Sequence, residues 1–279
     1  NNPSVSVIIL NINNSAFKIK GKSYEVKLLG KPMFSWVEKA CKPYKTKNVV
    51  CGFSESVMQV ILPELTDADV TVVLYADTPL IKHSTIVSAI DFLVFKELDA
   101  LKLPRGFVFN TSALKSGLNL NINESFFASE EEFFAVTNCQ AVAEASSVLQ
   151  TRINNFHMLN GVHIENPKTV IIESDVAIGA NVNIYSGTVI KGNSQILDDV
   201  TIKENCVIEN STIESGAVVF EFNKIINSVV HENALILGFN SISANSEIGK
   251  NASIENFCSI KGACILENEE VGAYSNLEE

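Results

Sequence analysis

Asp77 is the residue whose type and position most clearly suggest chemistry. It follows the apolar run TVVLY in the segment YADTP, and open parallel sheets bind ligands beyond the carboxyl ends of their strands. A carboxylate there can hold Mg²⁺ against substrate phosphates during phosphoryl or nucleotidyl transfer. The structural alternative is that Asp77 or Thr78 caps the next helix, with Pro79 in its first turn. Local features leave both interpretations open.

Asn138 and three lysines are the other candidates for a phosphate site. Asn138 could complete a metal site with Asp77, although an Asn just before a helix usually serves as its N-cap. Lys18, Lys20 and Lys22 could meet phosphates, although such lysines are more often solvated surface charge. Their segment, LNINNSAFKIKGK, supplies no Gly-rich turn or Arg fork of the kind that cradles a triphosphate.

The composition limits the classes of function. The 279 residues are enough for two domains, and 46% apolar with 19% charged residues is typical of a globular protein. A net charge of −11 argues against nucleic acid as a partner, and no apolar run approaches the roughly 18 residues of a membrane helix. The opening SVSVIIL lacks a basic n-region and predicts a first strand. The six cysteines show neither C-x-x-C nor zinc spacing, which favours a cytoplasmic location.

Strands and helices alternate at short spacing in the first 100 residues. This alternation predicts an α/β unit with a parallel sheet. A further helix is expected over residues 139–158, because Val142, Ala145, Leu149, Ile153 and Phe156 share one face. The predicted strands cover residues 5–10, 49–53 and 67–77, and the helices cover 33–40, 54–65 and 83–98.

Isoleucine recurs every six residues in the second half of the chain. Neither a helix nor a half-buried strand has this period, whereas a parallel β-helix with short flat faces does. The spacing drops to five between Ile208 and Ile213, and His231 stands where the shifted frame expects an apolar residue. We expect Phe220 and Phe222 to mark a bulge or a loop that leaves the coil. The regular positions are Ile172, Ile178, Ile184, Ile190, Ile196, Ile202 and Ile208, then Ile236, Ile242, Ile248, Ile254 and Ile260.

Four segments occur in an order that is typical of one family: LLGKPMFSWV, YADTPLI, the junction RINNFHMLNGV and the repeats ending ASIENFCSIKGACILENEEVGAY. The chain thereby resembles the bacterial bifunctional N-acetylglucosamine-1-phosphate uridylyltransferase/glucosamine-1-phosphate acetyltransferase family. The resemblance implies a reduced Rossmann-like nucleotidyltransferase domain over residues 1–138, a connecting helix over 139–160 and a left-handed parallel β-helix over 161–279. It also implies a homotrimer assembled through the β-helices.

The resemblance assigns roles to individual positions in the nucleotidyltransferase domain. It makes Asp77 the Mg²⁺-binding aspartate and Asn138 the asparagine that completes the metal site. Tyr75 and Ala76 would lie beside the nucleotide sugar. The chain departs from the family at the glycine-rich loop, which is replaced by Asn13-Asn14-Ser15-Ala16-Phe17-Lys18, and at Leu103-Pro104-Arg105, where the family has Asn-Thr-Gly.

The acetyltransferase half departs further from the family. Lys261 keeps a phosphate-binding position, but Ala273 and Tyr274 stand in the motif that supplies the catalytic His. Loss of that general base argues against acetyl transfer. We therefore expect a shortened and degenerate relative. It is either a weakened nucleotidyltransferase that makes UDP-N-acetylglucosamine from UTP and N-acetylglucosamine 1-phosphate, or a non-catalytic sugar-nucleotide-binding or trimeric scaffold protein. The missing loop favours the second function.

Overall fold

The protein consists of two compact units, each with its own core. A computed structural model describes residues 2–117, 120, 122 and 124–278 of the chain. The units are Asn1–Val148 and Leu149–Glu279. Within the described part of the chain, no helix is long and apolar enough to cross a membrane.

A five-stranded mixed sheet forms the centre of the first unit. Its strands run in the order β4-β1-β5-β7-β6; β4 and β5 are parallel to β1, whereas β7 is antiparallel to β5 and to β6. The parallel sheet expected for the first 100 residues is confirmed by β4, β1 and β5, and the antiparallel strands β6 and β7 extend it at one edge. The link between β6 and β7 is a tight hairpin, which is too short for a parallel crossover. The strands are β1 (Val5–Ile12), β4 (Lys45–Cys51), β5 (Val70–Tyr75), β6 (Ala100–Leu103) and β7 (Gly106–Asn110).

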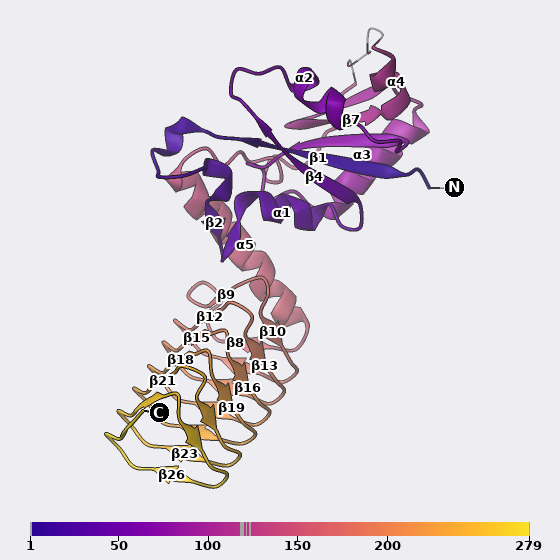
Figure 1. The fold of residues 1–279 in the computed structure, drawn as a ribbon. Coiled ribbons are helices and arrows are strands. Elements are labelled where there is room, and N and C mark those ends of the chain that lie inside the picture. Colours follow the sequence, from indigo (N-terminus) through magenta and orange to yellow (C-terminus); the bar gives the residue numbers. More distant parts are fainter. Residues whose placement is uncertain (1, 118–119, 121, 123, 279) are drawn as a thin grey trace. The chain divides into compact units, whose positions relative to one another are not determined.

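Helices cover both faces of this sheet, because alternate residues of its apolar strands point to opposite sides. Val7 and Ile9 share a core with α1 (Met33–Ala40) and α3 (His83–Phe95). Ile8 and Leu10 pack on the other face with α2 (Val57–Ile61) and α4 (Thr111–Ser116). Figure 1 shows α1 and α2 on opposite sides of β1. The remaining short elements are β2 (Lys27–Leu28), β3 (Lys31–Pro32) and three 3₁₀ turns, Ser15–Phe17, Ser23–Glu25 and Leu62–Glu64.

The predicted connecting helix is α5 (Cys139–Leu159). Ala145 and Leu149 are buried on the predicted face, but Phe156 is 63% exposed and His157 is buried instead. The apolar stripe therefore continues through a histidine, four residues after Ile153. On the same helix, the Asn154 amide donates hydrogen bonds of 2.8 and 2.9 Å to the carbonyl oxygens of Pro167 and Val170. These bonds attach α5 to the chain that enters the first coil.

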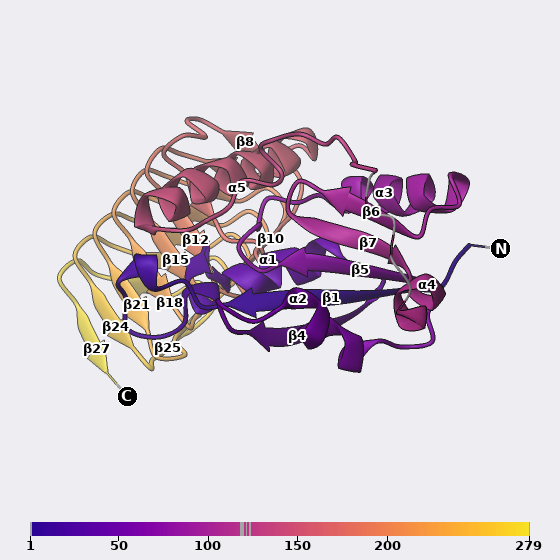
Figure 2. The ribbon, with the colours of Figure 1, turned by 90° about the horizontal axis from the view of Figure 1, so that it is seen from above.

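The second unit is a three-sided parallel β-helix built from two- and three-residue strands (Figures 1 and 2). One sheet has six strands and the other two have seven. The strands of the six-stranded sheet are β10 (Ala177–Ile178), β13 (Gln195–Ile196), β16 (Thr212–Ile213), β19 (Val229–Val230), β22 (Glu247–Ile248) and β25 (Cys264–Ile265). The first seven-stranded sheet contains β8 (His163–Ile164), β11 (Asn183–Ile184), β14 (Thr201–Ile202), β17 (Val218–Val219), β20 (Leu235–Ile236), β23 (Ser253–Ile254) and β26 (Glu270–Val271). The other contains β9 (Ile171–Ile172), β12 (Val189–Lys191), β15 (Val207–Glu209), β18 (Lys224–Ile226), β21 (Ser241–Ser243), β24 (Ser259–Lys261) and β27 (Asn276–Glu278).

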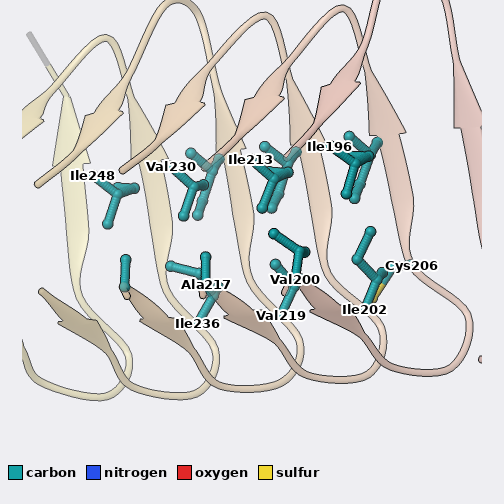
Figure 3. Close-up of a cluster of buried hydrophobic side chains, with 14 of the residues drawn as sticks. Ile196, Val200, Ile202, Cys206, Ile213, Ala217, Val219, Val230, Ile236 and Ile248 are labelled. Carbon is teal, nitrogen blue, oxygen red and sulfur yellow. The ribbon is translucent and has the colours of Figure 1, made fainter. Parts of the chain in front are cut away.

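The repeating isoleucines point into this β-helix, which confirms the predicted fold class. Most strands place one of them inward, directly above its counterpart in the preceding coil, as in the pairing Ile190↔Ile208. Val219, Val230 and Val271 take the inward position in strands without such an isoleucine. Figure 3 shows such a stack, in which Ile196, Ile213, Val230 and Ile248 form one row. All four side chains are at most 1% exposed. The six-residue period therefore reflects one inward position on each of three faces.

The disturbed part of the repeat does not leave the coil, so the expected bulge or loop at Phe220 and Phe222 is wrong. Val219 points inward, and the five-residue step after Ile225 brings Val230 to the inward position instead of His231. His231 lies on the outer side, with its Nδ1 3.1 Å from Glu214 Oε2. Each five-residue step leads into the six-stranded sheet, where a shorter corner leaves the stacking intact. The steps end at Ile213, Val230 and Ile265.

Truncation of an inward residue should destabilise the β-helix far more than truncation of its outward neighbour. Ile236 is fully buried and Leu235, on the same strand, is 36% exposed. Ile236→Ala should lower the free energy of unfolding by about 2–5 kcal/mol through lost burial and a cavity. Leu235→Ala, the matched control, should lower it by less than about 1 kcal/mol. Urea unfolding followed by circular dichroism measures both, and equal losses would contradict the inward assignment of Ile236.

Burial of His157 should make stability fall in mild acid. Burial lowers the pKa of this imidazole below its ordinary value of 6.5. The unfolded chain therefore binds more protons as the pH falls below about 6.5, and stability declines from there toward the folded-state pKa. His157→Gln should flatten this decline between about pH 6.5 and 5, whereas the same change at the exposed His163 should not. Thermal melts across this pH range test the prediction, and an unchanged slope in His157→Gln would refute it.

Candidate functional site

Asp77 lies just beyond the carboxyl end of β5, as predicted, and its carboxylate is paired with Arg105. The Nε of Arg105 donates to Oδ1 of Asp77 at 2.7 Å, and Nη2 donates to Oδ2 at 2.5 Å. The pair is partly shielded, since 22% of the Asp77 side chain and 34% of the Arg105 side chain are exposed. A bidentate pair of this kind fixes the planes of both groups and is among the stronger hydrogen-bonded contacts in proteins.

The β6–β7 hairpin brings Arg105 to Asp77. Leu74 of β5 pairs with Gly106 at the start of β7, so Arg105 lies opposite Tyr75 and close to Asp77. Gly106 has a φ of +130°, and a β-carbon there would overlap the carbonyl oxygen of Val73. Only glycine therefore allows this close approach. The sheet register and the glycine together place the guanidinium.

Tyr75 holds the other side of the guanidinium. The Arg105 Cζ lies 4.4 Å from the centre of the Tyr75 ring, a cation–π contact. Burial raises the pKa of the Tyr75 phenol, although the positive charge of Arg105 opposes this. Burial alone would lower the pKa of Arg105, but its hydrogen bonds to Asp77 raise the pKa above its ordinary value. Tyr75, Asp77 and Arg105 thus form one fixed cluster, which we call the Arg105 cluster.

Asn138 does not join Asp77 in a metal site. Its Oδ1 accepts a hydrogen bond from the Ala141 N–H at 2.9 Å, which makes Asn138 the N-cap of α5. The chain does pass beside Asp77, because the Val136 N–H donates to the Asp77 carbonyl oxygen at 2.8 Å. Among the described residues, no three His, Cys, Asp or Glu side chains are grouped as metal ligands. Both Asp77 oxygens accept hydrogen bonds from the Arg105 guanidinium, and the Asn138 side-chain oxygen caps α5. The site therefore does not fit Mg²⁺.

The structural alternative for Asp77 and Thr78, capping of the next helix, is wrong. Helix α3 begins at His83, and its N-cap, Lys82, makes no side-chain capping bond. The Thr78 hydroxyl instead donates to the Tyr75 carbonyl oxygen at 2.8 Å and closes a turn directly after β5. The turn delays the helix by several residues and leaves the Asp77 side chain available to Arg105. Ala76, the other residue expected beside a sugar, is buried.

The three lysines lie in an exposed loop whose backbone donors are used internally. Lys18, Lys20 and Lys22 are all exposed. The N–H groups of Asn14 and Ser23 bond to the side chains of Ser23 and Asn13, and the Lys18 N–H bonds to the Ser15 carbonyl. A phosphate cradle needs several free backbone N–H groups aimed at one point. The described loop therefore provides positive charge without the cradle.

The second unit keeps no acetyltransferase constellation at the predicted positions. Lys261 is paired with Glu278, with 2.6 Å between Nζ and Oε1. Tyr274 is 76% exposed, and its ring stacks on Phe257 with 5.2 Å between the ring centres. Neither Ala273 nor Tyr274 can act as the imidazole base that acetyl transfer requires.

The protein thus has two units, a mixed α/β sheet with an anchored carboxylate after its third strand in space and a parallel β-helix. No family model matches the chain. Over 141 residues, half of this chain, it is 38% identical to the bifunctional protein GlmU of Clostridium botulinum strain ATCC 19397. The GlmU of strain Loch Maree is 40% identical over the same length. The similarity to GlmU confirms the family resemblance over that half of the chain.

The chain matches only part of each of these relatives. The chain spans 31% of the length of these GlmU proteins. Among solved structures, the CMP:2-keto-3-deoxy-manno-octonic acid synthetase complexed with CTP aligns with 55% of this chain and 86% of its own, at 14% identity and a TM-score of 0.34. A TM-score this low carries no weight for fold or function.

Arg105 is the partner of Asp77 that the sequence pattern did not reveal. The sequence marked it only as a departure from the family, within Leu103-Pro104-Arg105. The available signal was an arginine directly before a glycine at the start of an apolar run, because such a glycine often marks a tight hairpin. Pairing it with Asp77 required the strand register, which joins residues 28 positions apart.

The Asp77–Arg105 pair should show a measurable coupling energy. In a double-mutant cycle of Asp77→Ala and Arg105→Ala, we expect about 1–3 kcal/mol of coupling in the free energy of unfolding, because the pair is bidentate and partly shielded. The Asp67–Lys115 pair is the matched control. Its carboxylate is fully exposed, and solvent screening should leave its coupling near zero. Equal coupling in both cycles, measured by urea unfolding, would contradict a special role for Arg105.

Proposed function

We propose that the chain is a non-catalytic relative of the sugar-1-phosphate uridylyltransferases that binds a sugar nucleotide without Mg²⁺-dependent transfer. One observation carries the proposal: Arg105 occupies both carboxylate oxygens of Asp77. In the family that the chain resembles, this aspartate holds Mg²⁺. Here a side chain of the protein supplies the positive charge instead.

The chemistry of the guanidinium supports binding and argues against transfer. A magnesium ion accepts oxygen ligands from several phosphates at once and draws them together. A guanidinium has donors only, in a fixed plane, and cannot bridge phosphate oxygens as an octahedral metal does. It has five N–H donors, of which the bonds to Asp77 use two. The remaining donors, next to the half-buried Tyr75, suit one phosphate of a nucleotide sugar.

The proposal has a second part: the β-helix assembles copies of the chain. The family resemblance implies a homotrimer, and a parallel β-helix presents long regular faces that suit side-by-side packing. All six cysteines are unpaired, which supports the cytoplasmic location expected from the sequence. The proposed protein is thus a self-assembling module that carries several sugar-nucleotide sites.

The competing function is a weak uridylyltransferase that forms UDP-N-acetylglucosamine and pyrophosphate from UTP and N-acetylglucosamine 1-phosphate. The similarity to GlmU favours it. It would require Arg105 to leave Asp77 so that Mg²⁺ could enter, and the sheet register and the Tyr75 contact both oppose this movement. The loop of Lys18, Lys20 and Lys22 also lacks the cradle for the triphosphate.

Two measurements on the intact chain test the proposal. A coupled pyrophosphate-release assay with Mg²⁺, UTP and N-acetylglucosamine 1-phosphate should show no turnover, and Asp77→Ala should leave this result unchanged. Calorimetry with UDP-N-acetylglucosamine in EDTA should show binding that Arg105→Ala weakens by about tenfold or more, the cost of losing a charged hydrogen bond. Asp67→Ala is the matched control, because Asp67 precedes β5, at the opposite end of the strand from Asp77, and its side chain is fully exposed.

Either measurement can refute its part of the proposal. Pyrophosphate release that requires Mg²⁺ and is abolished by Asp77→Ala would establish the competing enzyme. An absence of heat with UDP-N-acetylglucosamine in both the presence and absence of Mg²⁺ would rule out sugar-nucleotide binding and leave only the scaffold.

A further inference from the structure

The Arg105 cluster has no net charge, although an arginine stands at its centre. The Asp77 carboxylate lies 2.7 and 2.5 Å from two nitrogen atoms of the guanidinium and balances its positive charge. The third member, Tyr75, has a phenol whose pKa is raised by burial, so it is uncharged at neutral pH. Among the described residues, Asp77 and Tyr75 are the groups that act on the charge of Arg105. The cluster therefore offers hydrogen-bond donors without the attraction of an isolated cation.

The free donors of Arg105 lie on one edge of its guanidinium. The Nε–H and one Nη2–H are bound to Asp77, which leaves two N–H groups on Nη1 and one on Nη2. Arg105 has no further hydrogen-bond partner among the described residues. The Tyr75 ring, with its centre 4.4 Å from Cζ, covers one face of the group. A phosphate bound at the free edge is therefore near the positive guanidinium and the negative Asp77 at the same time.

The phosphates of candidate ligands differ in charge. A phosphate with two substituents, as both phosphates of a nucleotide sugar are, has one ionised oxygen and carries a single negative charge. A phosphate with one substituent, such as that of a sugar 1-phosphate or the terminal phosphate of UTP, carries about 1.5 to 2 charges at neutral pH. The second charge loses hydration on binding, and a guanidinium whose charge is already balanced offsets this loss less than a free one.

The lysines of the loop after β1 do not discriminate in the same way. Lys18, Lys20 and Lys22 are exposed, and exposed charges are screened beyond about 8 Å at physiological ionic strength. The Asp77 side chain is only 22% exposed and lies directly against Arg105, so salt screens its effect much less. Added salt should therefore remove the attraction of the lysines for any anion and leave the influence of Asp77 in place.

We infer that Asp77 makes the Arg105 cluster selective for phosphates with a single negative charge, as in a nucleotide sugar, over the doubly charged phosphates of a sugar 1-phosphate or a nucleotide terminus. The inference rests on the sugar-nucleotide binding proposed above and names the class of phosphate that the site accepts. Asp77 is a positioning residue in this site. It fixes the plane of the guanidinium and, through its charge, weakens the attraction for a second negative charge on the ligand.

Two ligands that differ only in the charge of one phosphate test the selectivity. The ligands are UDP and the methyl ester of its terminal phosphate, compared by calorimetry of the intact chain in EDTA and about 0.3 M salt, which screens the lysines. The wild type should bind the methyl ester about threefold or more tightly than UDP. Asp77→Asn removes the charge at nearly the same size and should shift this ratio toward UDP by about tenfold.

Asp77→Glu separates the charge of Asp77 from its shape. This variant keeps a carboxylate of a different length and should keep the preference for the methyl ester, whereas a purely structural role would make it resemble Asp77→Asn. Circular dichroism and the melting temperature check the fold of both variants, and the comparison of the two ligands on the wild type requires no variant.

The outcomes distinguish this inference from the proposed function. An absence of binding by UDP-N-acetylglucosamine, UDP and the methyl ester would overturn both. Binding of UDP-N-acetylglucosamine by a wild type that prefers UDP to its methyl ester would overturn the selectivity and leave the proposed function in place. An unchanged ratio in a folded Asp77→Asn variant would likewise overturn the role of Asp77 alone.

Discussion

Hydrogen bonding from coil to coil is the constraint on which the β-helix depends. Each strand bonds only to the strands directly above and below it, so every coil must return to the same three directions after one rise. Coils of 18 residues do so through pairs such as Val189↔Val207, and coils of 17 residues do so through pairs such as Gln195↔Thr212. The shorter coils lose their residue at a corner and never from a strand, because a lost strand residue would turn the next inward side chain outward.

The same requirement explains which parts of the fold could be predicted. A stacked interior demands a similar residue at every sixth position, and this periodicity is visible in the sequence before any contact is known. The sequence does not show which corner absorbs a missing residue, so His231 was expected at a position that Val230 occupies. Strand direction was similarly hidden. The direction of β7 depends on a hairpin, and the apolar run in GFVFN looks the same in a parallel or an antiparallel strand.

The candidate site shows a similar division between local and long-range information. The position of Asp77 after a buried strand followed from the local pattern and is correct. Its partner did not follow, because Arg105 reaches it through the pairing of β5 with β7. The Asn138 side chain took its ordinary local role as a helix cap. An aspartate and an asparagine at the expected positions therefore do not make a metal site; the side chains that compete for their oxygen atoms decide the outcome.

The contact of Asn154 with the entry to the first coil has a consequence for how the chain avoids polymerisation. The open end of any β-helix exposes a row of unpaired backbone groups that can template the addition of another strand. Asn154 and Gln150 donate side-chain N–H groups to the Val170 carbonyl oxygen, and Asn154 also donates to that of Pro167. These bonds place amide side chains where an incoming strand would pair. Helix α5 thereby covers this end of the β-helix as a terminal cap and occupies carbonyl oxygens to which an added strand would bond.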